Sequence, residues 1–234
     1  MTFSRWRAAG NEYLLGERAE LGSALTPARV RSEVADADGI LEVVSVDGAA
    51  AEVVIWNRDG STAEMSGNGT RIAARWLAER CGAEEVSIRV GPRTVTARIL
   101  KDGQVEQELG PVEVHPRELI AGLEVVPVSV GNPHAVVVGD PDDLPAIGPL
   151  LETHPRFPER TNVQVARVER PGRVVARVWE RGVGETLSSG TSAVAVAAAT
   201  HGEGDVVVSF PGGELRVRLE GGRARLTGPA ERVA

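Results

Sequence analysis

The chain has 234 residues, enough for one large domain or two small ones, and 42% of them are hydrophobic. Its formal net charge of −7 comes from interspersed arginines and carboxylates, which argues against nucleic acid as the main partner. No apolar run approaches the roughly 18 residues that span a bilayer, and the first residues lack a signal-peptide core, so a cytoplasmic protein without membrane contact is predicted.

Two residue counts exclude common kinds of chemistry. Cys81 is the single cysteine, so disulfides within the chain and cysteine-rich metal sites are excluded, and we expect it semi-buried just past a helix end. Lys101 is the single lysine and stands in the turn "LKDGQV", a poor place for a pyridoxal Schiff base. The four histidines have no metal-ligand spacing. Any amino-acid chemistry is therefore predicted to need no cofactor and no metal.

Most of the chain is predicted to form short strands joined by Asp-Gly, Pro-Gly and Gly-Gly turns. Valine-rich, often alternating segments stand at 85–90, 94–100, 104–109, 135–140, 173–180, 205–210, 214–220 and 223–228. Three stretches have a helical pattern. In the first, Ile72, Ala73, Trp76 and Leu77 share one face. The second, 142–154, has an acidic first turn, and the third, 192–202, ends at Gly202.

The first and third helices are each preceded by a serine and a glycine, which indicates an internal duplication. A shift of 123 residues places Ser66 on Ser189, Arg58 on Arg181 and Asn57 on Glu180, and a shift of 121 places Asn11 on Asn132. We therefore predict two similar halves. They are residues 1–113, joined by a C-terminal strand at about 225–234, and residues 114–224.

The repeated Ser-Gly at a helix start has two interpretations. Serine there is usually only an N-cap, and a Gly-Asn pair is usually a turn. Capping, however, does not require the same Gly-Asn partner and upstream arginine in both halves. A helix N-terminus offers unpaired N–H groups and a positive dipole end, and glycine lets a ligand approach them. The pattern favours a site for a carboxylate or a developing oxyanion.

Several long motifs resemble the diaminopimelate epimerase family. They are "NRDGSTAEMSGNGTRIAARWL", "VGNPHAVVV", "HPRFPERTNVQVARV" and "WERGVGETLSSGTSAVAVAAA", with "RAAGNEYLL" and "RLTGPAERV" at the two ends. The resemblance covers nearly the whole chain. It implies an α/β (α+β) fold of two pseudo-symmetric domains, each a β-barrel-like sheet around a central helix, with the active site in the cleft between them.

The resemblance also implies a function. The family interconverts LL- and meso-diaminopimelate, a precursor of lysine and the cell wall, without metal or pyridoxal. One thiolate removes the α-proton while a thiol on the opposite face delivers another. The partner implied is a small amino-acid substrate, and the family also implies a homodimer. Matching the motifs assigns substrate contacts to Asn11, Asn57, Gly67, Asn68, Asn132, Asn162, Glu180, Arg181, Gly190 and Thr191.

The chain departs from the family pattern at both catalytic positions. Cysteines are expected immediately before Gly67 and Gly190, and this chain has Ser66 and Ser189. A thiol titrates near 8.5 and an alcohol near 15.7, so an unassisted serine pair is predicted to be a very weak epimerase. Three explanations stay open: an epimerase carrying serine replacements, a relative with changed chemistry in which His134 or Glu180 supplies the base, and a non-catalytic amino-acid binder.

Overall fold

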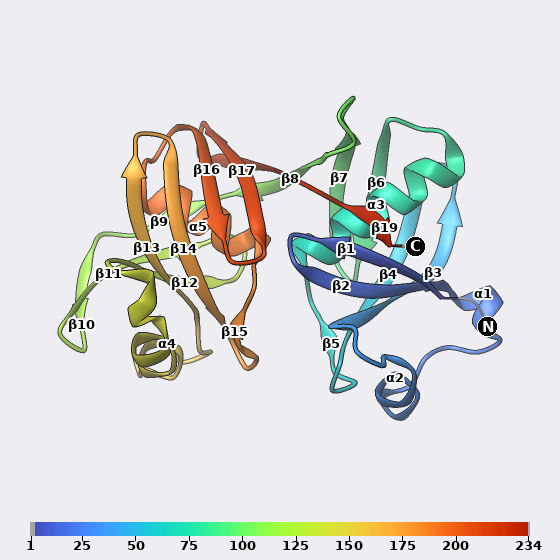
Figure 1. The fold of residues 1–234 in the computed structure, drawn as a ribbon, viewed down its shortest axis with the longest axis horizontal. Helices are drawn as coiled ribbons and strands as arrows, with labels where there is room; N and C mark the ends of the chain where they lie inside the picture. The colour runs from blue at the N-terminus through green and yellow to red at the C-terminus, as the bar shows by residue number, and fades with distance from the viewer. Residues whose placement is uncertain (1–2, 234) are drawn as a thin grey trace. The chain divides into compact units, whose positions relative to one another are not determined.

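The computed structural model describes residues 3–233, which fold as two compact units (Figure 1). Of the described residues, unit 1 comprises 3–108 and 228–233, and unit 2 comprises 109–227. The chain passes from one unit to the other within β8 (Val105–Pro111) and again at the end of β18 (Arg223–Gly228). The boundaries expected from the repeat, at 113/114 and about 224/225, lie a few residues from these crossings.

Unit 1 is a mixed sheet that surrounds one long helix. Its elements are β1 (Ser4–Ala8), β2 (Asn11–Glu17), α1 (Arg18–Leu21), α2 (Pro27–Glu33), β3 (Gly39–Asp47), β4 (Ala50–Asn57), β5 (Thr62–Ala63), α3 (Gly67–Cys81), β6 (Glu85–Val90), β7 (Arg93–Ile99), β8 and β19 (Glu231–Val233). From β1 to β8, leaving out the short β5, successive pairings are antiparallel, parallel, antiparallel, parallel, antiparallel and antiparallel.

Unit 2 repeats this arrangement. Its elements are β9 (Glu113–Val114), β10 (Glu118–Ile120), β11 (Leu123–Ser129), β12 (Pro133–Val138), the 3₁₀ turn η1 (Pro141–Asp143), α4 (Leu144–Glu152), β13 (Asn162–Arg170), β14 (Arg173–Glu180), β15 (Gly184–Thr186), α5 (Gly190–Thr200), β16 (Gly204–Phe210), β17 (Gly213–Glu220) and β18. From β11 to β18, leaving out β15, the pairings follow the same succession as in unit 1. The predicted duplication is therefore confirmed at the level of sheet topology.

Each unit buries its long helix against the inner face of its sheet. In unit 1, Ile72, Ala73 and Leu77 of α3 pack with Leu41 and Ile55 of the strands, all fully buried. In unit 2, α5 is almost wholly apolar and buried from Ser192 to Ala198, and it contacts β11, β12, β13, β14, β16 and β17. The alanines and valines that dominate α5 let the strands approach closely, which explains a core built with few aromatic residues.

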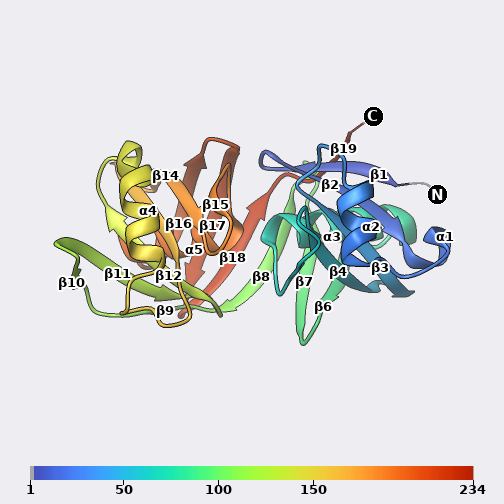
Figure 2. The ribbon, with the colours of Figure 1, turned by 90° about the horizontal axis from the view of Figure 1, so that it is seen from below.

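A second, outer layer covers the other face of each sheet (Figure 2). In unit 1, Leu21, Leu25 and Val30 of the α1–α2 segment pack on Ile40 and Trp56. In unit 2, Leu144, Ile147 and Leu151 of α4 pack on Val163 and Val165 of β13, and on Trp179. Strands β3 and β13 begin with runs of buried residues because they are covered on both faces.

The elements expected from the sequence are present, with two corrections. Helices α1 and α2 were missed because they are only 4 and 7 residues long. Cys81 is the last residue of α3 and is exposed, so the expectation of a semi-buried cysteine past the helix end was wrong. Lys101 lies exposed in the turn between β7 and β8, as expected.

The buried position of Leu77 in the centre of α3 gives a stability prediction. Leu77→Ala removes a fully buried side chain and leaves a cavity, so it should lower the free energy of unfolding by about 3 kcal/mol. Urea denaturation followed by circular dichroism measures this. The matched control is Leu119→Ala, at a side chain that is 76% exposed, which should change stability by less than about 0.5 kcal/mol. Equal losses in the two variants would contradict the assigned core.

Candidate active site

In unit 1 the start of α3 forms a buried polar turn. Ser66 is the N-cap, with extended backbone, and its hydroxyl accepts a hydrogen bond from the Gly69 backbone N–H at 3.1 Å. Gly67, Asn68 and Gly69 of the first turn are all buried. The Tyr13 hydroxyl lies 3.3 Å from Ser66 Oγ. Ser66 is therefore a helix cap, and its oxygen also has a phenol beside it.

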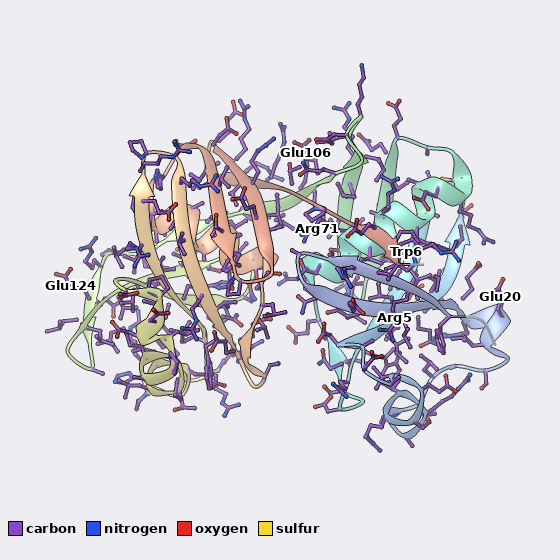
Figure 3. All side chains as sticks on the ribbon, in the orientation of Figure 1. Arg5, Trp6, Glu20, Arg71, Glu106 and Glu124 are labelled. Carbon is purple, nitrogen blue, oxygen red and sulfur yellow. The ribbon has the colours of Figure 1, made fainter. Side chains whose placement is uncertain are left out.

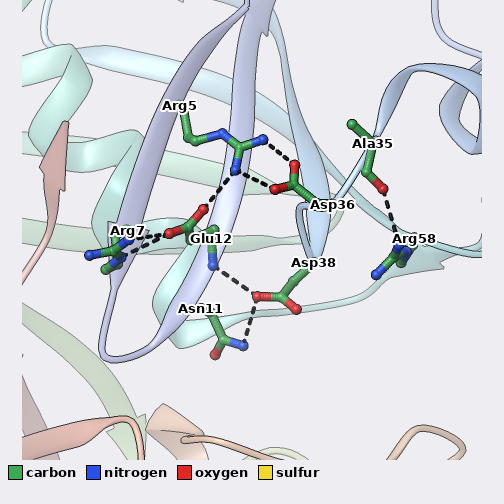
Figure 4. Close-up of polar contacts among 8 residues, drawn as sticks. All are labelled: Arg5, Arg7, Asn11, Glu12, Ala35, Asp36, Asp38 and Arg58. Atoms are coloured by element: carbon green, nitrogen blue, oxygen red, sulfur yellow. Dashed lines mark hydrogen bonds and ion pairs between the residues drawn. The ribbon is translucent and has the colours of Figure 1, made fainter. Parts of the chain in front are cut away.

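A chain of amide hydrogen bonds fixes the side chains around this turn, and Figure 4 shows the part of it between Asn11 and Asp38. Asn68 Nδ2 donates to Asn11 Oδ1 at 2.5 Å, and Asn11 Nδ2 donates to Asp38 Oδ2 at 3.3 Å. The same Asp38 oxygen accepts from the Glu12 backbone N–H at 2.8 Å. The structure thus brings together Asn11 and Asn68, as the sequence predicted, and holds Asn11 at both ends of its amide.

Arg71 is fully buried on the same helix (Figure 3). Its guanidinium donates to Asn68 Oδ1 and, at 3.4 Å, to the carbonyl of Pro229. Burial lowers the pKa of Arg71 to about 9, because the charged form has lost its hydration. A buried cation beneath the first turn of α3 adds to the positive potential of that helix end.

Beside Asn11, exposed ion pairs brace the β1–β2 hairpin. Glu12 accepts hydrogen bonds from Arg5 and Arg7, and Arg5 also pairs with Asp36. The Arg7 and Arg5 guanidinium groups hold the pKa of Glu12 below its usual range. Such exposed pairs contribute little to stability, so their role is to orient the hairpin that carries Asn11.

In unit 2 the corresponding cap meets a carboxyl group. Ser189, the N-cap of α5, makes no capping hydrogen bond to its helix. A side-chain interaction with the Ser189 hydroxyl lowers the pKa of the Glu180 carboxyl, which also accepts a hydrogen bond from Thr186 Oγ1 at 2.7 Å. Burial raises the pKa of Glu180, and the two hydroxyls only partly offset this. Two residues predicted from sequence, Ser189 and Glu180, therefore interact electrostatically.

Asn162 joins two other predicted residues. Its Nδ2 donates to the carbonyl of Pro133, the residue after Asn132, at 3.0 Å. Its Oδ1 accepts from the backbone N–H of Arg181, also at 3.0 Å. The Arg181 guanidinium itself donates to the carbonyl of Glu159 at 3.2 Å. Asn162, at the start of β13, thus links the start of β12 on one side to the turn after β14 on the other.

His134 is buried in a hydrogen-bonded row. Its Nε2 lies 3.0 Å from Asn132 Oδ1, and its Nδ1 lies 3.0 Å from Gln164 Nε2, which also donates to Ser192 Oγ at 2.9 Å. Because the first partner only accepts and the second only donates, the neutral ring carries its proton on Nε2. Burial lowers the pKa of His134 to about 3. Both ring nitrogens are already occupied.

In each unit, a buried glutamate accepts a hydrogen bond from a tryptophan on the strand that ends with a predicted site residue. Trp56 Nε1 donates to Glu42 at 3.0 Å, and Trp179 Nε1 donates to Glu152 at 2.7 Å. These tryptophans are related by the repeat and immediately precede Asn57 and Glu180. The two carboxylates come from different elements, β3 and α4, so the repeat relates the tryptophans but not the glutamates.

Both buried carboxylates remain ionised because they are fully hydrogen-bonded. Glu42 also accepts from Arg18 Nε at 2.8 Å and from the Leu25 N–H at 3.0 Å. Glu152 accepts from the Gly182 N–H at 2.8 Å, which ties down the turn after Arg181. Burial alone would raise the pKa of each glutamate, but the hydrogen bonds outweigh it and the pKa of each is lowered.

The structure therefore groups most predicted site residues within each unit. Asn57 is the exception: its amide donates to Ser61 Oγ at 2.9 Å, within its own turn. Sequence reasoning missed five residues that hold the site: Tyr13, Asp38, Glu152, Gln164 and Thr186. Only Tyr13 had a signal, because the repeat aligns it with His134.

Residues 3–233 contain neither a cluster of metal ligands nor a membrane-spanning helix. Within that range, no three side chains of histidine, cysteine, aspartate or glutamate gather closely enough to hold a metal ion. Over the same residues, no helix has the length and apolar character needed to cross a bilayer.

Two alike units, each a sheet around a helix with a buried Gly-rich start, define a fold shared with solved epimerases. A predicted epimerase from Pseudomonas aeruginosa matches with a TM-score of 0.73 and 16% identity, over 99% of this chain and 96% of that one. A hydroxyproline epimerase from Agrobacterium vitis also matches with a TM-score of 0.73 and 16% identity, over 99% and 89% of the two chains.

The family follows from sequence. The family described as diaminopimelate epimerase matches residues 17–115 and 126–233. A diaminopimelate epimerase from Synechocystis is 36% identical, over 100% of this chain and 97% of the relative. One from Xanthomonas axonopodis is 37% identical, over 98% and 93%. The chain belongs to the diaminopimelate epimerase family, whose members are isomerases.

The raised pKa of Glu180 predicts a pH-dependent stability. When the folded-state pKa exceeds the unfolded one, stability is lost as pH rises through the folded pKa. Glu180→Gln, which cannot ionise, should therefore raise the melting temperature at pH 8 by a few degrees, and the two proteins should converge at pH 4. The control is Glu159→Gln, at an exposed residue of the same unit. A Glu180→Gln gain that is equal at both pH values would contradict the assignment.

Proposed function

We propose that this protein acts on diaminopimelate as an epimerase, interconverting the LL and meso forms. The observation that carries the proposal is the repeated helix start: Ser66 before buried Gly67 in unit 1, and Ser189 before buried Gly190 in unit 2. In the family reaction, one such position removes the α-proton and the other delivers a proton to the opposite face. Each unit supplies one of the two positions.

The proposed substrate contacts divide into two kinds. The backbone N–H groups around Gly67 and Asn68, and around Gly190 and Thr191, suit the α-carboxylate, because a helix start carries N–H donors and positive potential. The distal end of the substrate carries both an ammonium and a carboxylate. Arg181 and Glu180, adjacent in sequence, offer the complementary charges.

The asparagines provide directional hydrogen bonds to the same substrate. Asn132 precedes β12, Asn162 begins β13, and Asn11 lies at the start of β2. Asn132 is oriented through its amide oxygen, and Asn11 and Asn162 are each oriented through both amide atoms. We propose that the remaining hydrogen-bonding capacity of these amides, together with Asn57, serves substrate.

Serine limits the rate of this reaction. The pKa gap of about 7 units between a thiol and an alcohol corresponds to roughly 10 kcal/mol for forming the base. A helix dipole contributes on the order of 1 kcal/mol and does not close that gap. We therefore propose that the reaction is slow and that neighbouring groups carry the proton.

Glu180 is the base that we assign in unit 2. It interacts with the Ser189 hydroxyl, and burial brings its pKa upward, toward the range in which a general base is most effective. His134 is a weaker candidate than the sequence suggested. Both of its nitrogens are hydrogen-bonded and burial disfavours its charged form, so we assign it to orienting Asn132.

A second candidate function rests on the same serines. Two alcohols in place of two thiols also fit a protein that binds a diamino acid without inverting it, and the residues that bind the two ends of the ligand would be unchanged. A relative with changed chemistry, such as a dehydratase or another amino-acid isomerase, is a third candidate, in which Glu180 would supply the base.

We also propose, from the family resemblance, a cytoplasmic homodimer. Its support is the resemblance alone, and sedimentation velocity of the purified chain tests the oligomeric state.

The proposed function predicts a large gain of activity from two substitutions. Ser66→Cys/Ser189→Cys should raise α-proton exchange with LL- and meso-diaminopimelate by more than about a thousandfold, because it restores thiols that ionise near neutral pH. Proton NMR in D₂O measures the exchange for both proteins.

Three results distinguish the candidates. Strong exchange only in the double variant supports an epimerase limited by its serines. Equal exchange in the two proteins would mean that the thiol argument is wrong. Absence of exchange in both, with diaminopimelate still bound in calorimetry, would support the non-catalytic binder.

A further inference from the structure

Tyr13 is the only tyrosine of the chain, and the structure places it at the cap of α3. It lies on β2, two residues after Asn11, and is 8% exposed. Its ring belongs to the core that contains Leu41 and Ile72, while its hydroxyl reaches to 3.3 Å from Ser66 Oγ. A buried tyrosine usually finds such a polar partner for its hydroxyl.

Gly39 makes the space in which the ring lies. It is the residue opposite Tyr13 in the parallel pairing of β2 with β3. A Cβ at Gly39 would come within 2.9 Å of Tyr13 Cε1 and within 2.2 Å of the Trp56 carbonyl oxygen. Any larger residue would have to displace the ring or the strand. The position of the phenol is thus fixed by backbone as well as by packing.

The hydrogen bonds of Ser66 leave a defined role for this phenol. A serine hydroxyl has one donor hydrogen and two acceptor lone pairs. The Gly69 N–H occupies one lone pair. If Tyr13 donates to the other, the hydrogen of Ser66 is left to point at a ligand. A phenol ordinarily titrates near 10, about 6 units below an aliphatic alcohol, so it is the better proton source.

We propose that Tyr13 is the proton partner of Ser66. When unit 1 delivers the proton, the Ser66 O–H bond breaks and its hydrogen passes to the substrate α-carbon, whose electron pair forms the new C–H bond. At the same time the Tyr13 hydrogen passes to Ser66 Oγ, and the phenolate left behind takes a proton from water. Proton removal is the reverse. This inference rests on the proposed function, and Tyr13 acts through Ser66 as a positioning residue.

The second unit supports the idea by contrast. The repeat places His134 where unit 1 has Tyr13, but His134 is engaged with Asn132 and Gln164. The hydroxyl of the cap Ser189 interacts instead with the Glu180 carboxyl, whose pKa it lowers. In each unit the cap hydroxyl is therefore associated with one acid-base side chain, and the two side chains come from different strands.

The test is a set of four proteins, all carrying Ser189→Cys so that unit 2 has a competent base. They combine the presence or absence of Tyr13→Phe with the presence or absence of Ser66→Cys. Incubation of one diaminopimelate isomer in D₂O yields two rates: exchange without inversion, and inversion, which also needs a proton from residue 66. With Ser66 retained, Tyr13→Phe should lower inversion by about a hundredfold, a usual contribution of acid-base catalysis. In the Ser66→Cys background it should lower inversion by less than about threefold, since the thiol carries its own proton.

Each alternative result overturns the proposed transfer of a proton from Tyr13 to Ser66. Equal loss of inversion with and without Ser66→Cys would mean a purely structural role for Tyr13. If Tyr13→Phe causes no loss of inversion while Ser66 is retained, the phenol delivers no proton. The same conclusion holds if inversion requires Ser66→Cys both with Tyr13 and with Tyr13→Phe. Inactivity of all four proteins would contradict the proposed function. A measurement without substrate then tests whether the Tyr13 hydroxyl donates a hydrogen bond to residue 66.

That measurement is the pH dependence of iodoacetamide alkylation of the thiol that Ser66→Cys introduces. The proteins retain Ser189 and also carry Cys81→Ser, so that the exposed natural thiol does not react. A phenol that donates to residue 66 stabilises the thiolate, so Tyr13→Phe should raise the pKa of the introduced thiol by about one unit. Identical profiles with and without Tyr13→Phe would show that the hydroxyl does not serve residue 66, whatever the substrate proves to be.

Discussion

The arrangement of both units depends on burying the first turn of a helix. A helix start has backbone N–H groups without intrahelical partners and a positive dipole end, and burial removes the water that would satisfy them. In α3, Gly67, Asn68 and Gly69 are all buried. Such a turn persists when caps and neighbours complete its hydrogen bonds or when an anion binds. In α3 the Ser66 hydroxyl serves the first purpose by accepting from the Gly69 N–H, whereas Ser189 makes no such bond to α5.

A hydrogen bond from a tryptophan to a buried glutamate in each unit also supports the site. Trp56 and Trp179 pack against the outer helical layer and donate inward to buried carboxylates. Removing either partner would leave a buried polar group unsatisfied, which costs more than the bond contributes. The residues that follow each tryptophan, Asn57 and Glu180, are thereby placed without support from substrate. The site is held by the core and not by exposed loops, as preorganised catalysis requires.

Sequence reasoning captured the duplication and the sheet-and-helix halves, and it named several residues that the structure groups within each unit. Those features leave periodic or repeated signals that a single chain displays. It missed α2, although Thr26 before Pro27 has the form of a helix start, because seven residues give too short a pattern. It could not find the contact of Tyr13 with Ser66, 53 residues apart, since only strand pairing brings them together. Likewise, the protonation state of His134 depends on burial and on Gln164, which spacing does not report.

The C-terminal segment has a consequence for how the protein is made. Strand β19 pairs with β1, and Pro229 accepts a hydrogen bond from the buried Arg71. During synthesis, every residue of unit 2 leaves the ribosome before this segment does. The first unit therefore depends on residues 228–233, which follow all of unit 2, before β19 joins its sheet and Arg71 gains its bond to Pro229. The unit whose translation begins first is thus completed after the other has been synthesised, and a nascent chain stalled before residue 228 would carry an unfinished first unit.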